Sequence, residues 1–240
     1  MVFARAYVLF YGQYTDLHKR IIDSMRKYMP KEECRPVFWA NTVSDETLYM
    51  LYELSQEFEA AHVVNSAENV PKYKAMRQLY HGEHKPYAPW ILWMDDDTYI
   101  VKPDWWKKTK AFLQSDPMIS YVGQKWYVHH ADGQWDFIKA ASWFKGKEPE
   151  MVPTKTKGVK KPGIWFMTGG YVWLKTGVMK ALNWPDQRLN HNGGDTLLGE
   201  AIRQQGLPRH HFDYGVMVNK AKRRGLSEAP AGATNKRLRR

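Results

Sequence analysis

The sequence predicts an α/β fold with a doubly wound, mostly parallel sheet, and three observations lead to that prediction. Short apolar runs alternate with helix-like segments through the first half of the chain, which is the pattern of β-α-β units. Two of these runs end at Gly12 and Asp95. Parallel sheets bind ligands beyond the carboxyl ends of their strands, so a site is expected at this edge. The length of 240 residues suits a single domain with a short tail.

The elements of the first half follow from residue type and spacing. Each expected strand is a short run of apolar, β-branched and aromatic residues. Each of the first two helices follows a Ser, Thr or Asp that can cap it. We expect strands at 5–11, 35–40, 61–64 and 90–94, and helices at 15–28, 44–54 and 72–80.

The second half is less regular. Helices are expected at 104–113 and 195–205, and strands at 119–122, 126–129, 165–174 and 212–218. The segment 145–163 is rich in Lys, Pro, Gly and Thr and predicts a long mobile loop. From residue 221 onward the chain has little hydrophobicity, which favours disorder. We therefore expect one domain at 1–219 and a basic, flexible tail at 220–240.

Cysteine usage and hydropathy bear on the compartment. Cys34 is the only cysteine, so no intrachain disulfide can form and a reducing compartment is favoured. No apolar run approaches the roughly 18 residues of a membrane helix. We expect a soluble, cytoplasmic protein without a membrane span, in the host cytoplasm if the source is viral.

The charge of the chain is concentrated in two segments. The net charge is +11. Residues 220–240 hold eight Lys or Arg against one Glu, and residues 139–161 hold seven Lys against two Glu. This distribution favours a polyanionic partner such as DNA. The alternative is a solvated tail and loop that aid solubility.

The most informative motif is the triplet Asp95-Asp96-Asp97 at the end of an apolar strand. Three adjacent carboxylates repel one another, and burying them unpaired would cost several kcal/mol each. Mg²⁺ and Mn²⁺ take carboxylate oxygens and bridge to diphosphate oxygens. The triplet therefore predicts a metal-dependent site for a nucleotide-sugar donor; the alternative is a plain acidic turn.

Three segments resemble the GT-A glycosyltransferases, and most closely their Fringe and core galactosyltransferase group. Residues 93–100, Trp-Met-Asp-Asp-Asp-Thr-Tyr-Ile, are similar to the DxD segment of that group. Residues 168–174 resemble its acceptor-side Gly-Gly strand in shortened form, and residues 194–199 its acidic helix start. The resemblance covers residues 3–219. It implies a GT-A, Rossmann-like mixed sheet and sugar transfer from a nucleotide sugar, such as a UDP-sugar.

The resemblance also implies roles for the triplet and for a histidine. Asp95 is expected beside the nucleoside sugar and among the metal ligands, Asp97 directly on the metal, and Asp96 between them. The group has a histidine metal ligand after its last helix, where His210 and His211 stand in this chain. Because adjacent residues of a strand face opposite ways, the choice between the two histidines stays open. A pair of surface histidines is the alternative.

Asp195 follows Gly193-Gly194 at a helix start. The resemblance implies that it is the general base of an inverting transfer, taking a proton from the acceptor hydroxyl. The helix dipole is expected to keep it ionised. The alternative is that Asp195 is only the N-cap of the helix.

Donor contacts are predicted from position. Phe10, Tyr11 and Gly12 end the first strand, where the base and ribose are expected. Lys74 and Arg77 lie three residues apart on one helix face and are candidates for the diphosphate, although solvated surface charge explains them equally well. The paired glycines of the second Gly-rich segment, Gly169 and Gly170, are also predicted to line the donor site.

The acceptor is inferred from charge and from the resemblance. Fringe-like transferases include enzymes that glycosylate hydroxymethylated pyrimidines in phage and kinetoplastid DNA. Phosphate contacts from the loop 139–161 and the tail 220–240 fit such an acceptor, and we expect a 5-hydroxymethylpyrimidine base, including hydroxymethylcytosine. One alternative is transfer to a bacterial or viral surface glycan or glycoprotein. Another is a non-catalytic nucleic-acid-binding module, which the triplet disfavours.

Overall fold

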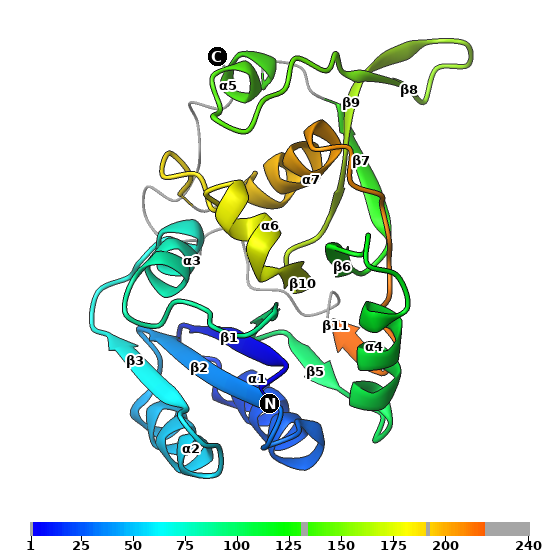
Figure 1. Ribbon diagram of the computed structural model, residues 1–240. Helices are drawn as coiled ribbons and strands as arrows, with labels where there is room; N and C mark the ends of the chain where they lie inside the picture. The colour runs from blue at the N-terminus through cyan, green and yellow to red at the C-terminus, as the bar shows by residue number, and fades with distance from the viewer. Residues whose placement is uncertain (1, 131–133, 191–192, 219–240) are drawn as a thin grey trace.

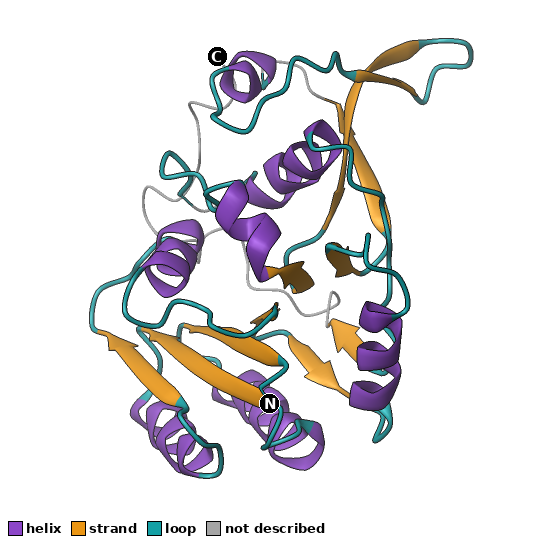
Figure 2. Cartoon of the chain, in the orientation of Figure 1, coloured by secondary structure: helices purple, strands orange, loops and turns teal. Residues whose placement is uncertain are grey.

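The computed structural model describes residues 2–130, 134–190 and 193–218 and confirms the α/β fold, with helices on both faces of a central sheet (Figures 1 and 2). The tail predicted at 220–240 lies outside the described residues. The sheet has six strands, in the order β3 (His62–Ser66), β2 (Cys34–Asn41), β1 (Ala4–Tyr11), β4 (Trp90–Asp95), β10 (Tyr171–Lys175) and β6 (Tyr121–Gly123).

The sheet is mixed, as the resemblance implies. Strands β3, β2, β1 and β4 are parallel, whereas β10 runs antiparallel to both β4 and β6. Leu9 of β1 pairs with Asp95 of β4, so the carboxyl ends of these strands meet at one edge. Tyr171, the first residue of β10, pairs with Met94 and lies at the same edge. Residues from three strands therefore converge on the end of β4.

The helices form one layer on each face of the sheet. Alternate residues of β1 face opposite sides, Tyr7 and Leu9 toward one core and Val8 and Phe10 toward the other. The first core also receives side chains from α3 (Lys72–His81), α5 (Trp135–Lys139), α6 (Thr176–Ala181) and α7 (Gly194–Gln204). The second receives them from α1 (Thr15–Tyr28), α2 (Asp45–Gln56) and α4 (Trp105–Gln114).

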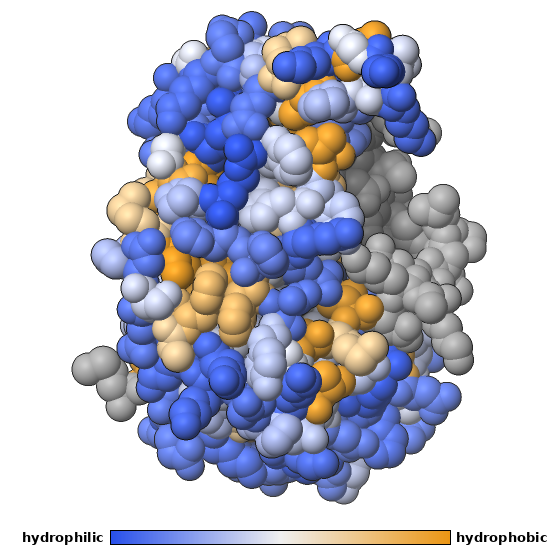
Figure 3. All heavy atoms as spheres, turned by 90° about the vertical axis from the view of Figure 1, so that its right-hand side faces the viewer, coloured by the Kyte–Doolittle hydropathy of each residue, from blue (hydrophilic) through white to orange (hydrophobic). Residues whose placement is uncertain are grey.

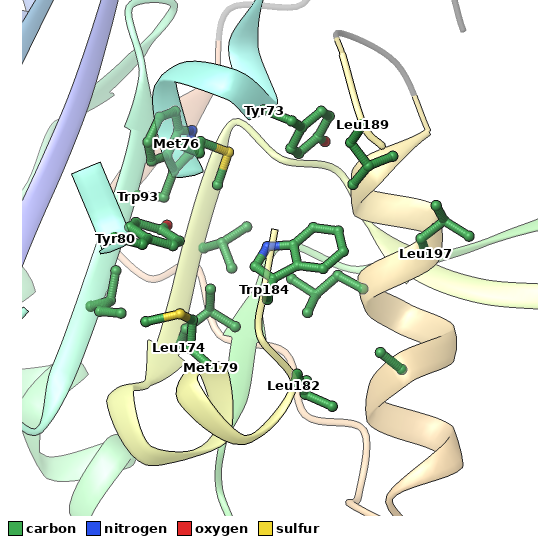
Figure 4. Close-up of a cluster of buried hydrophobic side chains, with 14 of the residues drawn as sticks. Tyr73, Met76, Tyr80, Trp93, Leu174, Met179, Leu182, Trp184, Leu189 and Leu197 are labelled. Carbon is green, nitrogen blue, oxygen red and sulfur yellow. The ribbon is translucent and has the colours of Figure 1, made fainter. Parts of the chain in front are cut away.

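The first core connects α3 to α7. Figure 4 shows Tyr73 and Met76 of α3 facing Trp184, with Leu197 of α7 on the far side. The Tyr73 and Trp184 rings meet edge to face with centroids 6.0 Å apart, a geometry that aromatic pairs favour. These large buried rings hold the first turn of α3 against the first turn of α7.

Two smaller sheets flank the central one. Strands β5 (Thr98–Ile100) and β11 (Val216–Val218) pair antiparallel, so only the end of the strand expected at 212–218 is extended. Strands β7 (Trp126–His130), β9 (Lys160–Met167) and β8 (Glu150–Pro153) form a three-stranded antiparallel sheet.

The prediction of a long irregular loop at 145–163 is wrong. Strand β8 and the start of β9 form a hairpin within it, at the upper right of Figure 1. The buried side chain of Val152 lies against Gly163 of β9, where a larger residue would collide with it. Pairing with a neighbouring strand therefore outweighs the loop-like composition.

The described residues also bear on membrane insertion. None of their helices is both long and apolar enough to cross a bilayer.

The close contact between α7 and β9 gives a test of the fold. At Gly199 an added Cβ would collide with the Trp165 carbonyl oxygen and lie 2.9 Å from Phe166 Cα, both in the backbone of β9. We expect Gly199→Ala to lower the free energy of unfolding by about 1–3 kcal/mol, because the strand must move to relieve the overlap. Urea unfolding followed by circular dichroism measures this change.

The matched control is Gly177→Ala in α6, where a Cβ meets nothing within 4 Å. Alanine there should leave stability equal or slightly higher, since it favours helix over glycine. Equal stability of the two variants would contradict the close packing of α7 on β9.

Candidate active site

The three aspartates at the end of β4 point in different directions. Asp95 and Asp97 are partly exposed, whereas Asp96 is only 1% exposed. Strand β4 ends at Asp95, and Asp96 and Asp97 follow in a turn, so the three side chains do not share one face. The site therefore contains two partly exposed aspartates, and the third is buried inside the protein.

Asp96 ties β4 to β1 and α1. Its Oδ2 atom accepts a hydrogen bond from the backbone N–H of Tyr11 at 2.9 Å and lies 3.2 Å from Nε2 of the buried His18. The other ring nitrogen of His18 is 3.0 Å from Thr47 Oγ1 of α2. This geometry gives Asp96 a structural role in place of the predicted donor contact, because its carboxylate faces the protein interior.

Asp95 is paired with a lysine that the sequence analysis did not single out. Lys72 Nζ lies 2.6 Å from Asp95 Oδ2 and 3.2 Å from the Gly169 carbonyl oxygen. The indole N–H of Trp93 donates to the other oxygen of Asp95 at 2.8 Å. The first residue of α3 thus neutralises the first aspartate of the triplet. A Lys at the start of the helix before the acidic strand is the only sequence signal for this contact.

The two basic residues predicted for the diphosphate lie elsewhere. Arg77 donates to the carbonyl oxygens of Asn183 and Pro185, at 3.2 and 2.6 Å, and so holds the loop after α6. Lys74 is exposed on α3. Because a helix turns about 100° per residue, Lys74 lies on a different side of α3 from Lys72. Of these lysines, only Lys72 contacts the triplet.

The end of β1 matches the prediction in part. Phe10 is fully buried against the rings of His18 and Phe38, so it is a core residue and not a donor contact. Tyr11 is partly exposed, and its hydroxyl accepts a hydrogen bond from Asn69 at 3.4 Å. Gly12 has φ of +72°, a conformation that glycine adopts without strain. Tyr11 and Gly12 remain candidates for the nucleoside side of the site.

Gly169 and Gly170 form the turn that borders the triplet. The Gly170 carbonyl accepts hydrogen bonds from the Asp95 N–H at 3.0 Å and from Thr98 Oγ1 at 2.6 Å. A Cβ at Gly170 would lie 3.8 Å from Asp97 Oδ1, and a Cβ at Gly169 would lie 3.2 Å from Lys72 Nζ. Glycine at both positions keeps the space beside these charged groups open.

Asp195 lies in the first helical turn of α7. The Gly169-Gly170 turn lies between it and the triplet. Residue Gly193, with φ of +84°, is the N-cap, so the interpretation of Asp195 as the N-cap is wrong. The Asp195 N–H donates to the Tyr73 hydroxyl at 2.9 Å, and Asp195 Oδ1 accepts from the Thr196 N–H at 3.1 Å. At Gly194 a side chain would collide with the Tyr73 ring. Tyr73 thereby fixes the start of α7.

The pKa of Asp195 is set by opposing effects. Burial raises it above the usual value for an aspartate, while the positive charge of Lys72 and nearby backbone N–H groups oppose that rise. The burial effect is the largest, so the helix start does not dominate as expected. A carboxylate with a raised pKa is a stronger base once ionised, which suits general-base chemistry.

The predicted histidine ligands do not join the aspartates. The His210 carbonyl accepts a hydrogen bond from the indole N–H of Trp126 at 2.9 Å, and its ring packs against Phe112 of α4. His211 is exposed. Within residues 2–130, 134–190 and 193–218, no three His, Cys, Asp or Glu side chains form a group that could hold a metal ion. His210 is instead held by its contacts with Trp126 and with Phe112 of α4.

Two carboxylates nevertheless fit a metal that binds together with its substrate. Mg²⁺ is commonly held by one or two carboxylates plus substrate phosphates, and not by a complete cage of protein ligands. Asp95 and Asp97, both partly exposed, supply that number. Asp95 first has to release Lys72 or share its oxygens with it.

A family comparison identifies the chain. The sequence profile of Glycosyl transferase family 2 matches residues 9–182, which include the end of β1, the triplet, the glycine turn and α6. The chain belongs to glycosyltransferase family 2. The predicted enzyme class is therefore confirmed at the level of the family. A search of curated protein sequences found no significant match.

Solved structures confirm the GT-A type of fold for this family-2 chain. The mannosyltransferase PcManGT from Pyrobaculum calidifontis, in complex with GDP-Man and Mn²⁺, has a TM-score of 0.59 at 13% identity and aligns over 88% of this chain and 54% of its own. S. aureus TarS with UDP-GlcNAc has a TM-score of 0.53 at 15% identity and aligns over 94% of this chain and 61% of its own. GalNAc-T7 with UDP, GalNAc and Mn²⁺ has a TM-score of 0.59 at 12% identity and aligns over 86% of this chain and 41% of its own. The chain thus spans only about half the length of these proteins.

The position of Lys72 leads to a prediction about the pKa of Asp195. Replacing Lys72 by Met removes the cation that lowers this pKa, so the pKa should rise further. Asp195 should then ionise only at higher pH. The acid limb of the pH profile of any activity that needs ionised Asp195 should therefore shift to higher pH. NMR titration of the aspartate carboxyl carbons in the free protein measures the shift.

The control for this titration is Lys74→Met, which removes the same charge from an exposed position on the same helix. Its effect on Asp195 should be small because solvent screens the charge. A Lys72→Met protein in which the pKa of Asp195 stays constant or falls would contradict the electrostatic link.

Proposed function

We propose that this chain transfers a sugar from a nucleotide-sugar donor, such as a UDP-sugar, to a hydroxyl group, with Mn²⁺ or Mg²⁺ held by Asp95 and Asp97. One observation carries the proposal: Asp97 and Asp195 border the same two-residue turn. A Cβ at Gly170 would lie 3.8 Å from Asp97 Oδ1, and a Cβ at Gly169 would lie 3.9 Å from Asp195 Cβ. This arrangement supports a donor bound on one side of the turn and an acceptor on the other.

The residues divide the reaction between them. Asp195 takes the proton of the acceptor hydroxyl as its oxygen attacks the anomeric carbon, and the bond to the diphosphate breaks on the opposite face, so the anomeric configuration inverts. Lys72, beside Asp95 and Gly169, supplies a positive charge near the leaving group. A divalent cation at the aspartates would neutralise the charge that develops on the diphosphate.

Two neighbours support the choice of cofactors. PcManGT binds GDP-Man and Mn²⁺, and GalNAc-T7 binds UDP, GalNAc and Mn²⁺. Both share the fold of this chain, and its two accessible aspartates suit the same class of ligand.

For the acceptor we propose a 5-hydroxymethylpyrimidine base in DNA. The hairpin β8–β9 carries four exposed lysines: Lys155, Lys157, Lys160 and Lys161. In Figure 3, which turns the right-hand side of Figure 1 toward the viewer, the upper part of the molecule is mostly hydrophilic. Lysines on such an arm can contact phosphates without reading sequence, and a modified base can be flipped out of the duplex to reach a transferase.

The acceptor is tested by incubating the protein, Mn²⁺ and a panel of labelled nucleotide sugars with DNA that contains 5-hydroxymethylcytosine or 5-hydroxymethyluracil. We expect label on at least one modified DNA and none on DNA with unmodified cytosine and thymine. Label on neither DNA, together with transfer to a surface glycan or glycoprotein, would contradict the DNA acceptor. Absence of both transfer and donor hydrolysis with every donor would contradict the enzymatic function.

The division of roles predicts two different defects. Asp97→Ala should abolish metal-dependent donor binding, because it removes a direct ligand. Asp195→Asn should leave donor binding intact and reduce transfer by roughly 10²–10⁴-fold, the usual effect of losing a general base. Calorimetry of donor binding and a transfer assay distinguish the two variants.

The control is Asp136→Asn, which neutralises an exposed aspartate in α5. It should change neither quantity. Full donor binding by Asp97→Ala, or transfer by Asp195→Asn at the wild-type rate, would refute the corresponding role.

A further inference from the structure

We propose that Tyr127 and Phe166 form an aromatic subsite that stacks a nucleobase next to the base being modified. This inference rests on the proposed DNA acceptor and identifies where the DNA lies relative to Asp195. It concerns side chains of the small sheet β7–β9–β8, which lie outside the carboxylate site described above.

The two rings face each other across a strand pair. Tyr127 of β7 pairs with Phe166 of β9 in register, so both side chains emerge on the same face of the sheet. Their ring centroids are 6.1 Å apart with a tilt of 39°. Both residues are partly exposed. Together they present two adjacent aromatic surfaces at one position on the molecule.

Core packing does not account for this pair. Neither ring belongs to the two hydrophobic cores formed by the described residues. The neighbouring Trp126, by contrast, packs against the first core and meets the Tyr121 ring edge to face at 5.4 Å. Adjacent residues of β7 thus differ, Trp126 joining the core while Tyr127 lies on the other face. Partly exposed rings outside a core suit the stacking of planar ligands.

The aromatic pair lies on the Asp195 side of β9. Phe166 Cα and Cβ lie 2.9 and 3.0 Å from a Cβ position at Gly199 of α7. Asp195 precedes Gly199 by four residues, so the two lie on the same face of α7, about 6 Å apart along its axis. Gly169, three residues beyond Phe166, lies beside Asp195. Figure 1 shows α7 next to β9 in this region. Phe166 therefore lies beside α7 about one helical turn from Asp195.

The charges around the pair favour a nucleic acid over a neutral glycan. Lys125 Nζ lies 5.3 Å from the centroid of the Tyr127 ring, and the exposed lysines of the β8–β9 hairpin are on the same small sheet. Proteins that bind single-stranded nucleic acid combine stacking aromatics with cations that follow the phosphates. A ring stacked on Tyr127 would have its phosphate within reach of Lys125.

The test uses a DNA strand that carries 5-hydroxymethylcytosine next to 2-aminopurine, whose fluorescence falls when it stacks. For Tyr127→Ala we expect a KM for DNA raised about five- to a hundredfold and loss of the fluorescence change, because stacking of one base is lost. The kcat and the rate of donor hydrolysis should stay within about twofold of wild type. Tyr127→Phe keeps the ring and should restore the wild-type KM and fluorescence.

A matched control is Tyr49→Ala, which removes an exposed ring from α2 on the other face of the central sheet. It should leave the KM for DNA unchanged. An unchanged KM in Tyr127→Ala, or an equal rise in Tyr49→Ala or Tyr127→Phe, would overturn the subsite while leaving the DNA acceptor intact. A wild-type enzyme that transfers to glycans and labels no modified DNA would overturn the acceptor and the subsite with it.

Discussion

Three adjacent carboxylates at the end of one strand repel one another, and much of the site is arranged around that repulsion. Asp96 is buried and accepts hydrogen bonds from β1 and α1, which fixes the edge of the sheet. Asp95 is paired with Lys72. Asp97 lies beside the open turn at Gly170. An unpaired buried charge costs several kcal/mol. The contacts of Asp96 and Asp95 lower that cost, which allows the three carboxylates to lie together at the edge of the sheet.

The first turn of α3 connects the two halves of the site. Lys72 contacts the triplet and the glycine turn, while the adjacent Tyr73 accepts a hydrogen bond from the Asp195 backbone and fills the space that Gly194 leaves. Burial raises the pKa of Tyr73 well above its usual value, so the phenol stays neutral beside Asp195. Tyr73 also packs edge to face on Trp184, so this turn lies against the first core. The triplet and the start of α7 are therefore joined through two consecutive residues of α3.

The fold was largely predictable from local sequence because its central strands are strongly apolar runs. The mixed sheet of GT-A type also followed from the resemblance. Features that depend on distant contacts were not predictable. The β8–β9 hairpin looked like a loop because its stability comes from pairing and from Val152 against Gly163. Lys72 could not be distinguished from Lys74 without knowing which side of α3 faces the triplet. His210 followed the expected order in the chain, but its contacts with Trp126 and Phe112 hold it elsewhere.

The central claim is that Asp97 serves the donor while Asp195 serves the acceptor, on opposite sides of one glycine turn. The most direct measurement is a crystal structure of the wild-type protein with Mn²⁺ and a non-hydrolysable nucleotide sugar. We expect the metal and the diphosphate beside Asp97, and the anomeric carbon facing Asp195 across Gly169 and Gly170. A metal bound away from Asp97, or a donor whose anomeric carbon faces away from Asp195, would contradict this division of roles.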